Sequence, residues 1–223
     1  MENKRVVLLG SRRLPAGGAA VIGRLVAGAL GASWSLSVGC ASGADRAAVR
    51  AALRAGAADR LRVYAVGGPD GRGYAGRASA FAGVLSASLA GASVRWWSAG
   101  PVSRPLRSRL VGRSIAAVRS AVEVGISGGA VVGVVDAPPP HAFAPPHAGG
   151  VWLSCGSGSW SALGAAALSG VRQVLVVPVG GLAGAGAGAG SLPELPGGPG
   201  RWAPVNAGIF AGALEWVPDS IPF

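Results

Sequence analysis

Short apolar runs that end in glycine- and serine-rich turns alternate with helix-like segments along most of this chain. The first runs cover residues 6–9, 35–38 and 61–66, and apolar residues at helical spacing fill 19–30 and 47–55 between them. Continuous apolar runs of this length are typical of strands buried on both faces of a parallel sheet. Strand–helix–strand alternation requires right-handed crossovers, with helices on both faces. The chain therefore predicts an α/β fold with a Rossmann-like, doubly wound, mostly parallel sheet flanked by helices.

The alternation continues less regularly in the second half of the chain. Residues 136–150 contain five prolines and both histidines (His141 and His147), so we expect a loop there rather than a metal site. The remaining predicted elements are a helix over 75–90, a strand over 94–97, a helical stretch over 104–121, strands over 130–135 and 151–153, a helix over 161–168 and a strand over 174–179.

The composition changes at Gly180. Residues 181–190 form a Gly/Ala tract, and prolines and further glycines follow it, which is typical of a linker. The last segment regains aromatic residues, among them Trp202, Phe210 and Trp216. We expect this segment to pack on the domain or on a neighbouring subunit, because many exposed aromatic side chains are costly. The sequence therefore predicts a Rossmann-like domain over 1–180 and a Gly/Pro-rich C-terminal tail over 181–223.

Positive charge dominates the chain and bears on its partners. Twenty basic residues face nine acidic ones, the net charge is +11, and Lys4 is the only lysine. A compositional bias explains arginine in place of lysine, but it does not explain the excess of basic residues. Such an excess favours a polyanion partner, and nucleic acid is the first candidate.

Other features narrow the class of protein. No apolar run is suited to a spanning helix, and the start of the chain leads directly into a strand-like run, without a signal peptide. Cys40 and Cys155 are too few and too far apart for a disulfide framework or a zinc site. We expect a cytoplasmic protein with no metal and no cofactor.

Glycine- and serine-rich turns follow three of the predicted strands. In open parallel sheets, ligands bind outside the carboxyl ends of the strands, where the strand order reverses. A turn that opens a helix directs backbone N–H groups and the positive helix end at one point, which favours an anion. Arginines that follow the strand over 94–97 complete the predicted site. The candidate ligand- or phosphate-binding residues are Gly10, Ser11, Arg12, Gly39, Gly43, Asp45, Arg107, Arg109, Arg113, Gly156, Ser157, Gly158 and Ser159.

Most of these residues have a structural interpretation beside the functional one. Asp45 either serves the start of its helix or bonds a ribose or base edge. The arginines over 107–113 either hold phosphates bidentately or lie on a solvated helix face. The two cysteines are expected to be buried thiols, because no histidine is at hand to activate them. Three tryptophans either stack bases or pack in the core: Trp96, Trp97 and Trp160.

Four stretches of the chain resemble, in order, motifs of the Rossmann-like SLOG superfamily, which includes the DNA-processing protein A (Smf) family and the LOG nucleotide hydrolases. Residues 7–12 resemble its strand-GSR opening, and residues 39–48 resemble its G-x-A-x-G-x-D turn and the helix after it. Residues 107–112 resemble the family's RNRIIA segment. Residues 157–180 resemble its SGSLxTA…VxAVPG ending, so the resemblance covers roughly residues 6–180.

The resemblance implies a homo-oligomeric nucleic-acid-binding module that holds single strands through arginine–phosphate contacts. Three positions depart from the family: Ser42 stands where it has Arg, Ser108 where it has Asn, and Ala162 where the hydrolase branch has Glu. Without that carboxylate, the expected general acid/base is missing, which favours binding over catalysis. The alternatives are a sensor of a small nucleotide or nucleotide derivative at the sheet edge, and an assembly protein with a degenerate site.

Overall fold

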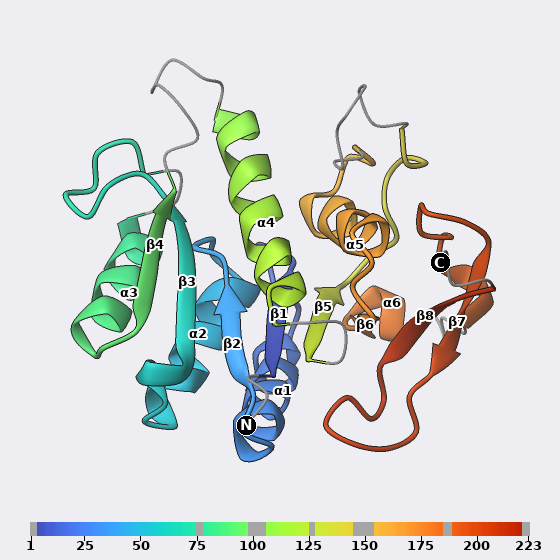
Figure 1. Cartoon of the computed structure of the whole chain (residues 1–223), viewed down its shortest axis with the longest axis horizontal. Helices are drawn as coiled ribbons and strands as arrows, with labels where there is room; N and C mark the ends of the chain where they lie inside the picture. Colours follow the sequence, from blue (N-terminus) through green and yellow to red (C-terminus); the bar gives the residue numbers. More distant parts are fainter. Residues whose placement is uncertain are drawn as a thin grey trace.

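The protein folds around one eight-stranded mixed sheet with the strand order β4-β3-β2-β1-β5-β6-β8-β7 (Figure 1). The computed structural model describes residues 4–74, 78–97, 106–124, 128–144, 154–184 and 189–219. Strands β1 to β6 are parallel, and β8 and β7 run antiparallel at one edge. The strands are β1 (Arg5–Gly10), β2 (Ser35–Val38), β3 (Leu61–Val66), β4 (Ser93–Trp97), β5 (Gly129–Val135), β6 (Gln173–Pro178), β7 (Gly200–Pro204) and β8 (Leu214–Pro218).

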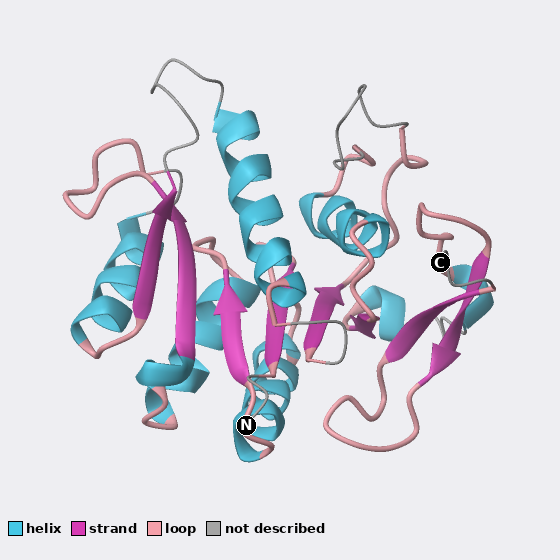
Figure 2. Ribbon diagram, in the orientation of Figure 1, coloured by secondary structure: helices cyan, strands magenta, loops and turns pink. Residues whose placement is uncertain are grey.

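Helices cover both faces of the sheet (Figure 2). Alternate residues of β1 enter opposite cores: Val6 and Leu8 pack with α1, α2 and α3, and Val7 and Leu9 pack with α4 and α5. This alternation is the physical reason for the continuous apolar run, because successive side chains of a strand point to opposite faces. The helices are α1 (Gly18–Gly31), α2 (Ala44–Arg54), α3 (Ala78–Leu89), α4 (Leu106–Val122), α5 (Gly158–Leu168) and the short α6 (Gly181–Gly184).

The direction of winding reverses between β1 and β5. From β1 the chain proceeds outward through β2 and β3 to β4, and α4 then leads back to β5 on the other side of β1. The pairing Gly10↔Val134 brings the carboxyl ends of β1 and β5 side by side. This arrangement is the topological switch point at which open α/β sheets bind ligands. The predicted Rossmann-like α/β fold class is therefore confirmed.

Two helices begin earlier than the sequence predicts. Helix α2 begins at Ala44, directly after Gly43, whose φ of +76° suits a glycine. Helix α5 begins at Gly158 and not at residue 161, because Ser157 caps it by accepting a hydrogen bond from the Trp160 amide. The predicted strand over 151–153 lies outside the described residues.

The C-terminal segment adds a hairpin to the sheet. Strand β8 pairs with β6, and the loop between β7 and β8 returns to the turn between α1 and β2, where Phe210 meets Trp34 edge-on at 5.5 Å between ring centroids. The expected packing of the aromatic segment is therefore confirmed. The described part of the stretch predicted as a linker contains regular structure: α6 begins at Gly181, and Leu192 and Leu195 are buried. The division into 1–180 and 181–223 stays a prediction.

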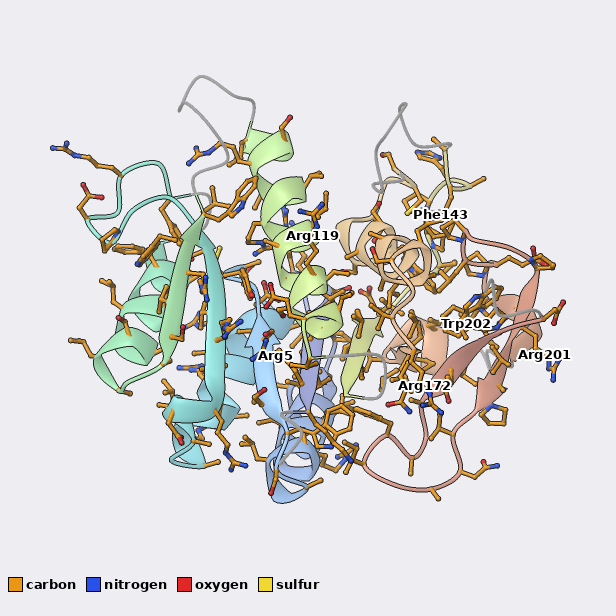
Figure 3. All side chains as sticks on the ribbon, in the orientation of Figure 1. Arg5, Arg119, Phe143, Arg172, Arg201 and Trp202 are labelled. Atoms are coloured by element: carbon orange, nitrogen blue, oxygen red, sulfur yellow. The ribbon has the colours of Figure 1, made fainter. Side chains whose placement is uncertain are left out.

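Three tryptophans join the hairpin to α5. Trp202 lies edge-on to Trp160 at 6.2 Å and to Trp216 at 5.4 Å, and its indole N–H donates to the Pro193 carbonyl oxygen at 2.8 Å. Trp202 of β7 lies inside the molecule, whereas its neighbour Arg201 is exposed at the outer edge (Figure 3). The hairpin thus contributes to the core as well as to the sheet.

We expect Trp202→Ala to destabilise the fold by about 3–5 kcal/mol, because it removes a buried aromatic ring and leaves a cavity. Urea unfolding followed by circular dichroism measures this loss. The control is Leu168→Ala, since Leu168 is 37% exposed and should cost about 1 kcal/mol or less. Equal losses for the two variants would mean that the hairpin does not pack on α5.

Candidate functional site

The turns after β1 and β2 meet backbone to backbone. The Ala44 amide donates to the Ser11 carbonyl oxygen at 3.0 Å. A Cβ on Gly43 would collide with the backbone of Ser11 and Arg12, and a Cβ on Gly10 would lie 2.6 Å from the Val134 carbonyl oxygen. These glycines therefore allow the two turns and the end of β5 to approach closely. The predicted meeting of these two turns at one sheet edge is confirmed.

A buried ion pair joins helices from opposite faces across this edge. The Arg113 guanidinium of α4 lies 3.4 Å from the Asp45 carboxylate of α2, and the residues are 8% and 6% exposed. The Ala41 amide donates to the same Asp45 oxygen at 2.9 Å, and the Cys40 thiol lies 3.5 Å from Arg113. A Cβ on Gly39 would collide with both charged groups, so this glycine makes room for the pair.

Burial is the largest influence on the pKa values of both members of this pair. Removal from water raises the pKa of the Asp45 carboxyl, and the Arg113 guanidinium and the Ala41 amide oppose this rise by stabilising the carboxylate. Burial also disfavours the charge on Arg113, but the Asp45 carboxylate beside it raises the pKa of the guanidinium overall. Each charge therefore depends on its partner to be tolerated inside the protein.

A second arginine of α4 also faces inward. Arg109 is 6% exposed and donates to the Gly73 carbonyl oxygen at 2.7 Å. The Nε atoms of Arg109 and Arg113 are buried without a hydrogen-bond partner in the described part of the chain. Neither residue lies on a solvated helix face, and their phosphate-binding role stays a prediction. The side chain of Arg107 lies outside the described residues.

Tyr74, in the loop before α3, bonds the turn after β2 that also contacts Arg113. Its hydroxyl donates to the Cys40 carbonyl oxygen at 2.7 Å, and burial raises the pKa of the phenol. Tyr74 also contacts Phe81, which lies near Trp96. The loops after β2 and β3 and helix α4 are thus held together by hydrogen bonds at the carboxyl ends of the strands.

The backbone at the start of α5 has the features that the sequence predicts for an anion-binding turn. Gly156 has a φ of +80°, and Ser157 is used as the helix cap. Gly158 and Ser159 are the first two residues of α5, so their amides have no acceptor within the helix. Gly158 is exposed and Ser159 is half-buried. These amides are the groups that could meet an anion.

Asp136 belongs to this edge although it is not among the sequence-predicted residues. It follows β5 directly, is half-buried, and accepts a hydrogen bond from the Ser11 hydroxyl at 2.5 Å. The next residue, Ala137, accepts the indole N–H of Trp160 at 2.9 Å, which ties the edge to α5. The signal available in the sequence is an acidic residue at a strand's carboxyl end, but its position at the start of a proline-rich stretch favours a loop assignment.

The tryptophans divide between core and surface. Trp160 is 1% exposed and packs in the core, whereas Trp96 and Trp97 are half-buried. Trp97 packs so tightly on α4 that a Cβ on Gly112 would overlap its ring. Both cysteines are buried, as predicted.

The chemistry that this edge offers is polar recognition. Its groups are the two α5 amides, the exposed Arg12 and the carboxylate of Asp136. Within the described ranges, no three His, Cys, Asp or Glu side chains are grouped so that they could hold a metal ion. No helix among the described residues combines the length and apolar character that a membrane span requires.

Comparison with known proteins yields one structural neighbour. No protein-family model and no curated protein sequence matches the chain. The fold is similar to part of DNA processing protein A from Streptococcus pneumoniae, with a TM-score of 0.38 and 19% sequence identity. The match covers 59% of this chain and 50% of that protein, so this chain matches about half of its neighbour's length. That this chain belongs to the SLOG superfamily, whose motifs it resembles, stays a prediction.

We expect Asp45→Asn and Arg113→Met each to destabilise the fold by about 3–5 kcal/mol, because each leaves one buried charge without its partner. The double variant should lose less than the sum of the two, with a coupling energy of about 1–3 kcal/mol in a urea double-mutant cycle. The exposed pair Arg201–Asp219, at 3.6 Å, is the control and should couple by less than about 1 kcal/mol. If the losses in the free energy of unfolding for Asp45→Asn and Arg113→Met were additive, the two residues would not interact.

Proposed function

We propose that the protein binds a nucleoside phosphate at the edge formed by the turns after β1 and β5 and the start of α5. The observation that carries the proposal is the direct linkage of these segments: the Ser11 hydroxyl bonds Asp136, and Trp160 of α5 bonds Ala137. The linkage lies at the switch point between β1 and β5. These two bonds support the proposal, because they join the segments that carry the donors for a phosphate and the acceptor for a sugar.

The phosphate would be bound by the α5 amides and Arg12. The amides of Gly158 and Ser159 stand at the positive end of an eleven-residue helix. Arg12 is exposed, and its backbone carbonyl oxygen accepts a hydrogen bond from the Ser42 hydroxyl at 3.3 Å. The loop is thereby anchored while the guanidinium remains available for a charge-assisted contact.

Asp136 supports a nucleoside and not a bare phosphate. A carboxylate repels a phosphate, but it accepts hydrogen bonds from sugar hydroxyls, as acidic residues do for ribose in dinucleotide-binding folds. One Asp136 oxygen already accepts from Ser11, which orients the carboxyl group. A ligand with a phosphate at one end and a ribose at the other satisfies both kinds of group.

Calorimetric titration with AMP and 2′-deoxy-AMP tests this proposal. We expect Arg12→Ala to weaken AMP binding roughly 10- to 100-fold, the range of a lost charge-assisted hydrogen bond. Asp136→Asn should reduce any preference for the ribonucleotide. Arg24→Ala is the control, because Arg24 is exposed on α1 and should leave the affinity unchanged. The proposal fails if AMP, ADP, ATP and inorganic phosphate give no binding heat at millimolar concentration.

Single-stranded nucleic acid is the second candidate, favoured by the net charge of +11 and by the adjacent exposed arginines Arg12 and Arg13. Because Arg109 and Arg113 face inward, phosphate contacts would depend on these loop arginines and on residues of other surfaces. In this proposal the protein binds backbones with little base readout, as arginine–phosphate contacts do. Homo-oligomerisation belongs to the same proposal.

Binding of an oligo(dT) strand at several salt concentrations tests the second candidate. We expect a log–log slope of about −0.7 for each phosphate contact, and Arg12→Ala with Arg13→Ala should make the slope shallower by about 0.7 for each arginine removed. Arg24→Ala again serves as the control. Binding that does not vary with salt would exclude this mode of recognition.

A further inference from the structure

A groove between α2 and α3 is lined by residues that are not part of the proposed nucleotide site. Its volume is about 320 Å³, and it runs from the turn after β2 along the two helices. Val49 and Leu53 of α2 and Ala80 and Val84 of α3 give it an apolar lining. A Cβ on Gly83, which also lines the groove, would meet no atom within 4 Å, so there is open space above the α3 backbone.

Helix α3 has an unusual surface for a helix at the side of a protein. Its twelve residues include no charged side chain, and Leu89 near its end is 90% exposed. Ala82 and Ser86, which face the groove, are exposed as well. A helix that is uncharged on all sides is typical of one covered by protein. The described chain covers only one side of α3.

The opposite wall of the groove is basic. Arg50 lines it and is exposed, and Arg54 lies exposed one helical turn further along α2. Among the described residues, neither arginine has an acidic group within salt-bridge distance. Among the described residues of the lining, Asp45 is the only one with a carboxylate, and it is buried against Arg113. The groove thus combines an apolar lining with a positively charged rim.

We propose that this groove binds an acidic amphipathic helix of a partner protein. Apolar side chains of such a helix would fill the space above Gly83, and its carboxylates would meet Arg50 and Arg54, which is the helix-in-groove mode of recognition. A second copy of this chain fits this groove less well, because the chain has only nine acidic residues to offer to Arg50 and Arg54. A phosphate backbone would leave the apolar lining unfilled.

The test uses the full chain and a fluorescein-labelled 18-residue helical peptide with leucines at i, i+3, i+4 and i+7 and glutamates elsewhere. Anisotropy should show saturable binding that Gly83→Trp weakens at least tenfold by filling the groove, and that Arg50→Glu weakens at least fivefold. Gly23→Trp and Arg24→Glu on α1 are matched controls, because Gly23 also has open space around it and Arg24 is also exposed. Neither control should change the affinity.

Three outcomes would overturn the proposal. A scrambled peptide of the same composition could bind equally well, which would mean charge attraction alone. Gly83→Trp could leave peptide binding unchanged while circular dichroism shows a native fold. Oligo(dT) could lose affinity on Gly83→Trp while the peptide does not bind, which would assign the groove to nucleic acid. Should Gly83→Trp disturb the fold, Ser86→Trp, at an exposed position in the same lining, replaces it.

Discussion

The buried ion pair of Asp45 and Arg113 is the interaction on which the edge at the carboxyl ends of the strands depends. It links α2 on one face of the sheet to α4 on the other, across the carboxyl end of β2. Two charges in this position are tolerated only together, because each alone would stand in a low-dielectric interior without compensation. Gly39 is required beneath them, since any side chain there would occupy the space of the pair.

The pairing of Arg113 with Asp45 indicates a structural role for the arginines of α4. In the sequence, Arg109 and Arg113 follow a strand end and carry the chemistry of phosphate recognition. In the fold, Arg109 bonds Gly73 and Arg113 pairs with Asp45, and the groups of the proposed nucleotide site are Arg12, the α5 amides and Asp136. The arginines of α4 therefore support the loops, and the loops present the groups that could bind a ligand.

The C-terminal hairpin has a comparable supporting role at the other end of the sheet. Without β8, strand β6 would form an exposed edge, and unpaired edges are templates for unwanted strand pairing. The hairpin pairs with β6, contributes Trp202 and Trp216 to the core of the α5 face, and returns a loop to Trp34 near α1. A stretch of low apolar content thus connects two parts of one sheet.

The sequence by itself determined the α/β class, the parallel strands and the meeting of the Gly10 and Gly43 turns, because strand periodicity and glycine-rich turns are local signals. It also favoured packing of the tail's aromatic residues, which the structure confirms for Trp202, Phe210 and Trp216. Only the tertiary structure decided that Arg113 pairs with Asp45, that Asp136 joins Ser11, and that β8 completes the sheet beside β6. These contacts join residues far apart in the chain, and whether an arginine faces solvent or a buried carboxylate depends on which helix packs opposite it.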